Sequence, residues 1–157
     1  MQVYLDIDGV MVVANSWRRP HILDDGFPKF SAKSTAALNY LLTKIDAEIF
    51  LTTSHKHLYS VADWKNIFKN RNVHLTSIVK LPENKNMLNR KDELLFWFRN
   101  NPPKEKFLII DDDKTLNGLP NIYKSHLIQT DPAIGFTKKL VDEGLEKQAH
   151  SNNVHSN

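Results

Sequence analysis

The stretch VYLDIDGV, from Val3 to Val10, predicts the fold more directly than any other part of the chain. Its apolar part, Val3–Ile7, is typical of a strand that opens the protein. Asp6 and Asp8 stand two positions apart, so an extended backbone places both carboxylates on one side. Gly9 lets the chain turn sharply after them. Two carboxylates this close repel each other unless a cation joins them, and a hard divalent ion such as Mg²⁺ prefers oxygen ligands. The alternative is a strand that runs into an acidic turn, with both carboxylates in water.

A second stretch of the same kind, FLIIDDD, runs from Phe107 to Asp113. It is an apolar strand that ends in three consecutive acids, and like charges so close destabilise a fold that has no counter-ion. Between the two stretches, strand-like apolar runs alternate with segments of helical period. This alternation predicts an α/β fold with a central parallel sheet and helices on both faces. In open parallel sheets, ligands bind at the carboxyl ends of the strands, so the acids of both stretches are expected at one edge.

The remaining elements follow from the same patterns. Strands are predicted at Glu48–Thr52, Val73–Val79, Phe107–Ile110 and Ser125–Gln129, and helices after Ser31 or Ser34, at His57–Phe68, at Lys91–Arg99 and after Thr137. The segment Met11–Phe30 has no clean period and contains Pro20, Gly26 and Pro28, which predicts a loop or flap. We expect a single domain over residues 1–149 and a disordered polar tail over 150–157.

Two weaker features lie between the acidic stretches. Thr52, Thr53 and Ser54 follow the second strand and offer hydroxyls to a phosphate oxygen, although hydroxyls at a strand end are often only turn formers. Thr53 is preferred because it lies just past the apolar run. Lys91 begins the helix before the FLIIDDD strand and could reach an anion, although helical lysines are usually solvated. The alternatives to this lysine are Lys80 and Lys85.

Taken in order, the four features resemble the motifs of the haloacid dehalogenase (HAD) superfamily of phosphohydrolases. The first motif of that superfamily, an apolar strand followed by D-x-D-G-[TV], is matched by Leu5–Val10. Its second motif, an apolar strand ending in Thr or Ser, is matched at Thr53, and its third, a lysine before a helix, at Lys91. Its fourth motif, an apolar strand ending in two acids, is matched by Asp111 and Asp112. The resemblance implies a Rossmann-like three-layer sandwich and a bound Mg²⁺.

The resemblance also implies a role for each matched residue. Asp6 would attack phosphorus and form an aspartyl-phosphate, and Asp8 would protonate the leaving oxygen and then activate water. Thr53 and Lys91 would hold the phosphoryl oxygens. The metal ligands would be Asp6, the backbone carbonyl of Asp8, Asp112 and the adjacent Asp111. An aspartate at position 8 resembles the phosphatase branch, because the dehalogenases of the superfamily lack it and its ion pumps carry threonine there.

Composition narrows the setting of the protein. The chain has 157 residues and no cysteine, which excludes disulfides, thiolate zinc sites and cysteine nucleophiles and fits a reducing compartment. No stretch approaches the roughly 18 apolar residues of a membrane span, and the start lacks the features of a signal peptide, so a cytoplasmic protein is expected. The formal net charge of +3 is a mild basic excess that would help a polyanionic substrate approach.

The gaps between the motifs leave no room for an inserted cap domain, which would need roughly 50 residues. No cap domain is therefore expected, and an open site suits a phosphate on a large molecule, such as a nucleic-acid end. Trp17, Arg18, Arg19 and His21 of the flap could meet such a substrate, or could be ordinary surface residues. The GFT sequence at Gly135–Thr137 adds a resemblance to HAD phosphatase modules attached to nucleic-acid repair enzymes.

Two other functions stay open on the sequence alone. One is a small-molecule phosphatase for nucleotides or sugar phosphates, with the flap as a lid. The other is a non-catalytic binding module that kept the fold, although idle buried carboxylates argue against it. His55 and His57 lack clustered partners and are interpreted as helix-entry residues.

Overall fold

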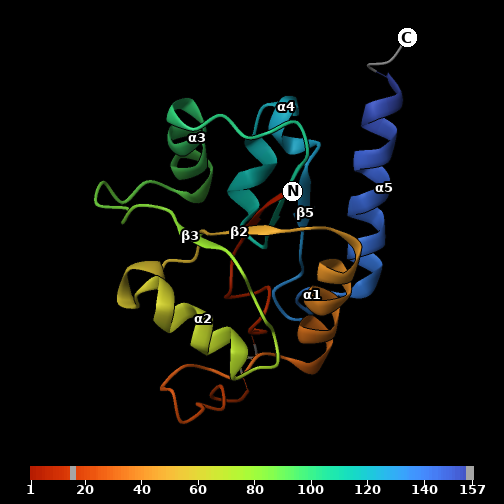
Figure 1. The fold of residues 1–157 in the computed structure, drawn as a ribbon. Coiled ribbons are helices and arrows are strands. Elements are labelled where there is room, and N and C mark those ends of the chain that lie inside the picture. Colours follow the sequence, from red (N-terminus) through yellow and green to blue (C-terminus); the bar gives the residue numbers. More distant parts are fainter. Residues whose placement is uncertain (15–16, 155–157) are drawn as a thin grey trace.

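The structure, a computed structural model, describes residues 1–14 and 17–154, with side chains through His150. Its centre is a five-stranded sheet in the order β3-β2-β1-β4-β5, and every neighbouring pair of strands is parallel (Figure 1). The strands are β1 Gln2–Leu5, β2 Glu48–Leu51, β3 Ile78–Lys80, β4 Phe107–Asp111 and β5 Leu127–Gln129. The first strand is therefore central, and Leu5 pairs with Leu51 on one side and Ile110 on the other. The prediction of an α/β sandwich with a central parallel sheet is confirmed.

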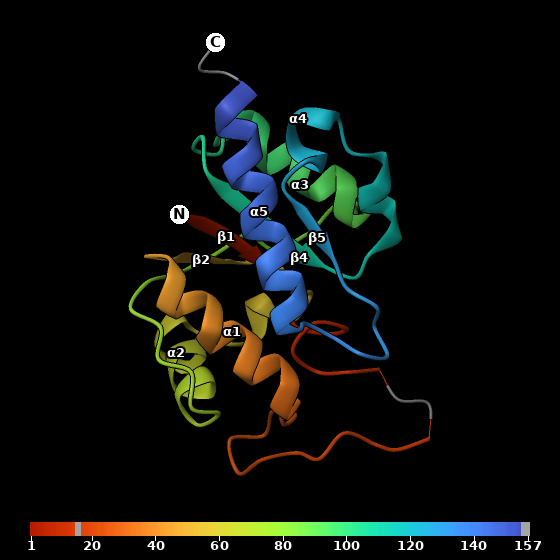
Figure 2. The same ribbon diagram turned by 90° about the vertical axis from the view of Figure 1, so that its right-hand side faces the viewer.

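Helices cover both faces of the sheet, which makes three layers. One face carries α1 Ala32–Lys44, α2 Val61–Lys69 and α5 Lys138–Val154, and the other carries α3 Arg90–Asn100 and the short α4 Asn121–Lys124. Two 3₁₀ turns, η1 Lys56–Leu58 and η2 Lys114–Gly118, follow β2 and β4. Figure 2 shows α5 crossing the strands, with α1 and α2 below it. Apart from β2, the described residues between β1 and β3 form the flap, α1, η1 and α2, and none of them forms a separate cap.

The side chains of β1 point alternately to the two faces of the sheet, so this strand contributes to the hydrophobic core on both faces. Val3 and Leu5 pack with α1, α2 and Val141 of α5, whereas Tyr4 faces the cluster formed with α3 and α4. All three of these β1 side chains are at most 1% exposed. Fully burying an aliphatic side chain contributes about 1.5–3 kcal/mol, so a one-residue shift of this strand would lose both faces at once.

The flap, residues 17–30, is attached to α2 by one buried arginine. The guanidinium of Arg71 donates to both carboxylate oxygens of Asp25 at 2.5 and 2.9 Å. It also donates to the backbone oxygens of Phe27, Pro28 and Ile67 at 2.7, 3.0 and 2.7 Å. The hydrogen bonds from Arg71 hold the pKa of Asp25 well below its usual range. The flap is thus a fixed part of the fold over the residues that bond to Arg71.

Several elements differ from the sequence-based expectations. The third strand is shorter than predicted, because Asn72 has a φ of 61° and Val73 still donates to Phe68 O at the end of α2. Pairing with β2 therefore starts only at Ile78. Neither η2 nor α4 was predicted. The former is capped by the Asp113 side chain, which accepts from the Thr115 backbone N–H at 2.8 Å.

The C-terminal end of the chain also differs. Helix α5 continues to Val154, so residues 150–154 are helical where a disordered tail was expected, and 155–157 lie outside the described residues. Over the described part of the chain, no helix has the length and apolar character needed to cross a membrane.

Candidate active site at the carboxyl edge of the sheet

The two acidic stretches meet at the carboxyl ends of β1 and β4. Asp6 directly follows β1, Asp111 ends β4 and Asp112 comes next, and one carboxylate oxygen from each lies within 4.8 Å of the others. Asp6 and Asp111 are 4% and 1% exposed. The Asp6 backbone N–H donates to Ile110 O at 3.0 Å, so the pairing of β1 with β4 continues up to the site. The fold therefore brings together three of the four acids expected to bind a metal.

Gly9 is required by the position of Asp112. Its φ is +77°, in the left-handed region that other residues rarely adopt. A Cβ at this position would lie only 2.2 Å from Oδ2 of Asp112. The turn after β1 can therefore approach the second acidic stretch this closely only because it carries no side chain.

The cation that contacts the acids is Arg90, the first residue of α3. Its Nη2 lies 3.5 Å from Oδ1 of Asp6, and its Nε lies 3.1 Å from Oδ2 of Asp111. The second of these is a charge contact without the alignment of a hydrogen bond. Nη1 donates to Oε1 of Glu93 at 2.8 Å and to the backbone oxygen of Thr52. The guanidinium thus joins the ends of β1, β2 and β4.

Lys91 does not reach the acids. Its side chain lies against η2, with Nζ 3.6 Å from the position of a Cβ on Gly118, and its backbone N–H donates to Thr115 Oγ1 at 3.3 Å. Among the described residues, no ion pair links Lys91 to an acidic side chain. The place expected for the lysine is taken by Arg90, one residue earlier. The alternatives lie elsewhere: Lys80 donates to Tyr59 O at 2.8 Å, and Lys85 is an exposed loop residue.

A second buried cation stands behind Arg90. Lys56 is 2% exposed, and its Nζ donates to Oε2 of Glu93 at 2.9 Å. The two oxygens of Glu93 are therefore shared between Lys56 and Arg90. With Asp6, Asp111, Asp112 and Glu93 counted as carboxylates, these two cations leave the cluster with a formal charge of −2. One divalent cation would neutralise the cluster.

Burial makes the charged forms of two of these acids costly. The pKa of Asp6 lies well above its usual range because burial disfavours the carboxylate and Asp111 repels it, and the charge of Arg90 offsets this only in part. Burial also raises the pKa of Asp111 to about 6, against the lowering effect of Arg90. The three converging carboxylates carry more negative charge than the neighbouring cations neutralise, and they offer only oxygen atoms as ligands. Both properties fit a hard ion such as Mg²⁺.

Among the hydroxyls after β2, that of Thr52 is a candidate to bind a ligand. Its backbone N–H donates to Leu5 O at 3.1 Å, so it lies beside the start of the acidic turn. Its Oγ1 is buried and has no hydrogen-bond partner among the described residues. By contrast, Oγ1 of Thr53 already accepts from the His55 backbone N–H at 3.3 Å, and Ser54 is exposed. Thr52 is therefore a second candidate beside Thr53, the preferred choice from the sequence, whose hydroxyl hydrogen can still be donated.

Asp8 lies apart from the buried cluster. Its side chain is 56% exposed, and its Oδ2 lies 2.8 Å from Nε2 of His55, whose side chain is 41% exposed. The sequence interpretation of His55 as a helix-entry residue missed this contact. The sequence did contain a sign of this contact, because His55 follows Thr52–Ser54 directly and so lies at the same edge of the sheet as Asp8.

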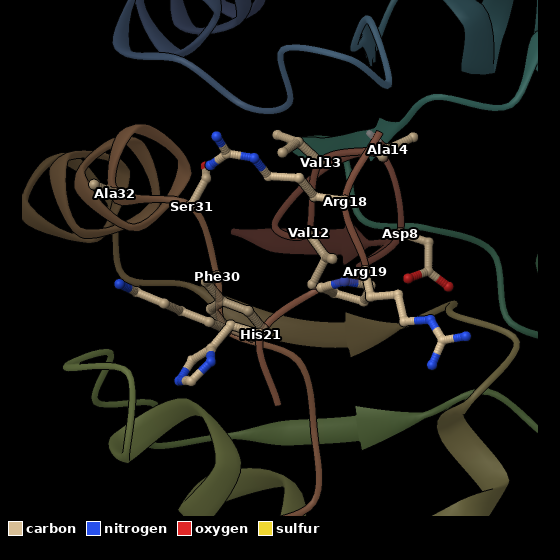
Figure 3. Close-up of a pocket in the computed structure, with 13 residues that line it drawn as sticks. Asp8, Val12, Val13, Ala14, Arg18, Arg19, His21, Phe30, Ser31 and Ala32 are labelled. Atoms are coloured by element: carbon tan, nitrogen blue, oxygen red, sulfur yellow. The ribbon is translucent and has the colours of Figure 1, made fainter. Parts of the chain in front are cut away.

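A pocket of about 850 Å³ opens next to Asp8 and is lined by the turn after β1, by both ends of the flap and by the start of α1. Its basic residues are Arg18, Arg19, His21 and Lys29. Figure 3 shows the Arg19 guanidinium at the same end of the pocket as the Asp8 carboxylate, whereas Arg18 extends toward Ser31. Trp17 is 90% exposed and is not among the described residues that line the pocket. Two of the three expected substrate residues thus line a basic pocket beside Asp8.

An open parallel sheet, with three acids and one arginine converging at the carboxyl ends of its central strands, is the arrangement that the resemblance to HAD-type domains predicts. Comparison with protein families agrees: residues 2–141 match the family described as the HAD domain in Swiss Army Knife RNA repair proteins. The chain belongs to this family. No curated protein and no solved structure matches the chain.

Proposed function

We propose that the protein is a Mg²⁺-dependent phosphomonoester hydrolase that works through an aspartyl-phosphate on Asp6. The observation that carries this proposal is the acidic cluster of the buried Asp6 and Asp111 with the half-buried Asp112. Together with Glu93, Arg90 and Lys56, the cluster has a formal charge of −2. Buried like charges are expensive to maintain without a function. Membership in a HAD family supports the same reaction class.

In the first step, a carboxylate oxygen of Asp6 forms a bond to phosphorus, and the bond from phosphorus to the ester oxygen breaks. The leaving oxygen takes its proton from Asp8, which is exposed and therefore able to exchange protons with water. In the second step, the Asp8 carboxylate takes a proton from a water molecule whose oxygen attacks phosphorus. Inorganic phosphate leaves, and the Asp6 carboxylate is restored.

Arg90 and Thr52 are the residues proposed to hold the phosphoryl oxygens, in place of Lys91 and Thr53. Arg90 already contacts Asp6, and Thr52 has a buried hydroxyl without a partner. Asp6, Asp111, Asp112 and the backbone carbonyl of Asp8 would hold Mg²⁺. When bound, the ion reduces the repulsion between the Asp6 carboxylate and the phosphate and polarises the phosphoryl group.

The proposed substrate is an exposed phosphate on a large molecule, such as a nucleic-acid end. A general acid must lie next to the leaving group, so the rest of the substrate extends from Asp8 into the pocket that Arg18, Arg19, His21 and Lys29 line. A polynucleotide supplies further phosphates for these cations, and Trp17 offers an exposed ring for stacking. The description of the family as part of RNA repair proteins supports this substrate class. A cytoplasmic location stays a proposal, supported by the absence of cysteine.

The mechanism is tested with Asp6→Asn, measured on a generic aryl phosphate. The amide is a poor nucleophile of nearly the same shape, so turnover should disappear while the circular dichroism spectrum and the thermal unfolding curve keep their cooperative form. Substantial residual activity in a clean preparation would overturn the aspartyl-phosphate scheme. A chelator should stop the wild-type reaction, and added Mg²⁺ should restore it.

The substrate class is tested by comparing a phosphorylated oligonucleotide with the matching mononucleotide. We expect a higher kcat/KM for the oligonucleotide at low salt and a smaller preference at moderate salt, because phosphate contacts release counterions. Arg18→Ala together with Arg19→Ala should reduce the preference and leave the aryl phosphate nearly unaffected. A matched control removes two exposed cations that precede β4 at the opposite edge, Lys104→Ala with Lys106→Ala. A preference for the mononucleotide would instead indicate a small-molecule phosphatase.

A further inference from the structure

The contact between Asp8 and His55 joins two motifs that the proposed mechanism treats separately. Asp8 belongs to the turn after β1, and His55 lies just before η1, after β2. Their side chains meet through Oδ2 of Asp8 and Nε2 of His55, 2.8 Å apart. One carboxylate oxygen of Asp8 is therefore engaged, and Oδ1 is left to face a substrate.

The imidazole of His55 is held in place from two sides. Its backbone N–H donates to Oγ1 of Thr53 at 3.3 Å, which fixes the chain where it enters η1. Its ring meets the ring of Phe27 edge to face, with 6.1 Å between the ring centroids. Phe27 is 4% exposed, and its backbone oxygen accepts from the Arg71 guanidinium at 2.7 Å. The flap thus supports the histidine from the side of α2.

Such support matters because Asp8 has no burial to fix its side chain. An exposed carboxylate samples several rotamers, and an acid catalyst must lie within hydrogen-bond reach of the leaving oxygen. Exposed ion pairs add little stability, so the Asp8–His55 contact contributes little to folding. Its effect on orientation is larger, because a displacement of about 1 Å in a catalytic group can lower the rate by about 10²-fold.

We infer that His55 is a positioning residue that holds the Asp8 carboxyl group in the orientation needed for proton transfer to the leaving group. This inference rests on the proposed phosphatase function. It gives the flap a part in catalysis through Phe27, in addition to the substrate contacts proposed above. His55 itself is not expected to contact the phosphate.

The test uses two substrates of similar size, p-nitrophenyl phosphate and benzyl phosphate. Nitrophenolate leaves without help, whereas benzyl alcohol must be protonated as it departs. The ratio kcat/KM reports the steps up to release of the leaving group, so only benzyl phosphate senses proton donation by Asp8. We expect His55→Ala to lower kcat/KM by about 10- to 100-fold for benzyl phosphate and by less than about threefold for p-nitrophenyl phosphate.

Three further variants separate positioning from a general structural effect. His55→Gln places an amide nitrogen near the position of Nε2 and should recover much of the benzyl phosphate activity. His57→Ala removes an exposed histidine of η1 and should behave like wild type on both substrates. In an Asp8→Asn background, His55→Ala should cause little further loss, because the two residues act in one step.

Each outcome separates the inference from the function on which it rests. If p-nitrophenyl phosphate hydrolysis survives Asp6→Asn, the proposed function fails, and the inference fails with it. If that hydrolysis depends on Asp6 but His55→Ala lowers kcat/KM equally for both substrates, the function stands and the positioning role is refuted. An equal rise in KM for both substrates would assign His55 to phosphate binding, which also overturns the inference.

Discussion

The sharpest consequence of the acidic cluster is that Mg²⁺ should stabilise the fold, and that this stabilisation should depend on Asp112 and not on its neighbour Asp113. The cluster carries a formal charge of −2, and Asp112 contributes one of its three converging carboxylates. Asp113 instead caps η2, where its Oδ1 accepts from the Thr115 N–H at 2.8 Å and from the Thr115 hydroxyl at 2.6 Å. The two adjacent aspartates therefore make a matched pair.

The expected magnitudes follow from binding linkage. At Mg²⁺ a hundredfold above its dissociation constant, the native state gains about 2.7 kcal/mol. For a chain of this size that corresponds to a rise in Tm of about 5–10 °C. If Asp112→Ala weakens binding tenfold, the gain at the same concentration falls to about 1.4 kcal/mol, and it falls further for a larger loss of affinity. Without metal, Asp112→Ala should not lower Tm, because it removes repulsion from the site.

Asp113→Ala should give the opposite signature. The loss of a cap lowers stability by about 1 kcal/mol, so the metal-free Tm falls, but the full increase on adding Mg²⁺ remains. Thermal unfolding of the three proteins with chelator and with Mg²⁺, at one pH, measures all of these quantities. A wild-type Tm that ignores Mg²⁺ would refute the metal site. A larger loss of the Mg²⁺ effect in Asp113→Ala would show that the ligands in the second acidic stretch are assigned one residue too early.

Three further predictions follow from neighbouring contacts. Gly9→Ala should remove most of the Mg²⁺-dependent rise in Tm. The Cβ of the alanine would lie 2.2 Å from Oδ2 of Asp112 and must displace that side chain. An unchanged rise in Tm with Mg²⁺ would contradict this prediction. Arg90→Ala should lower the free energy of unfolding, measured in urea without metal, by about 3–5 kcal/mol, since it leaves buried carboxylates unpaired. Lys91→Ala should change it by less than about 0.5 kcal/mol. Equal effects of the two substitutions would show that Lys91 also contacts the acids. Asp25→Asn should lower the free energy of unfolding at pH 7 by about 2–4 kcal/mol. The reason is that the pKa of Asp25 in the folded state lies below its usual value. The carboxylate therefore stabilises the fold at any pH above its unfolded pKa of about 3.9. That difference should shrink as pH falls below about 4, and a gap of the same size at pH 3 and pH 7 would show that the Arg71–Asp25 pair is not its cause.

The fold and the acidic part of the site could be predicted because both depend on patterns that survive small errors. A run such as FLIID is buried in almost any register, and parallel strands always bring their carboxyl ends to one edge. Asp6 and Asp111 therefore meet whatever the exact ends of β1 and β4 are. The same reasoning needs no knowledge of the loops between them.

The choice between neighbouring residues could not be made in this way. One position along a helix rotates a side chain by about 100°, so whether Arg90 or Lys91 faces the acids depends on where α3 begins. The Asn89 side chain sets that point by accepting from the Asp92 N–H. The preference of arginine for buried carboxylates was the usable signal, because its planar fork can meet two partners at once.

The sequence could not separate Thr52 from Thr53, and it missed the contact of His55, for a different reason. Their roles depend on how the chain leaves β2, and the sequence TTSHK offers hydroxyls at three successive positions. The path is settled where Thr53 Oγ1 accepts from the His55 N–H, which fixes the chain so that the imidazole reaches Asp8, while Thr52 Oγ1 lies buried beside it without a partner among the described residues. A local hydrogen bond of this kind has no periodic signature in a sequence.

The flap connects the proposed substrate contacts to the proposed chemistry without any domain that must close. Arg71 fixes the backbone at Phe27 and Pro28 from the side of α2, Phe27 packs against His55, and Lys29 of the same segment lines the basic pocket. A mobile cap has to enclose its substrate and open again for each turnover, which limits how large the leaving group can be. On the proposed function, a flap that is already in place next to Asp8 would position the acid before the substrate arrives and would leave the pocket open for a chain that extends beyond it. On the proposed function, the support of the flap by Arg71 is therefore what allows this small domain to work on a phosphate at the end of a polymer.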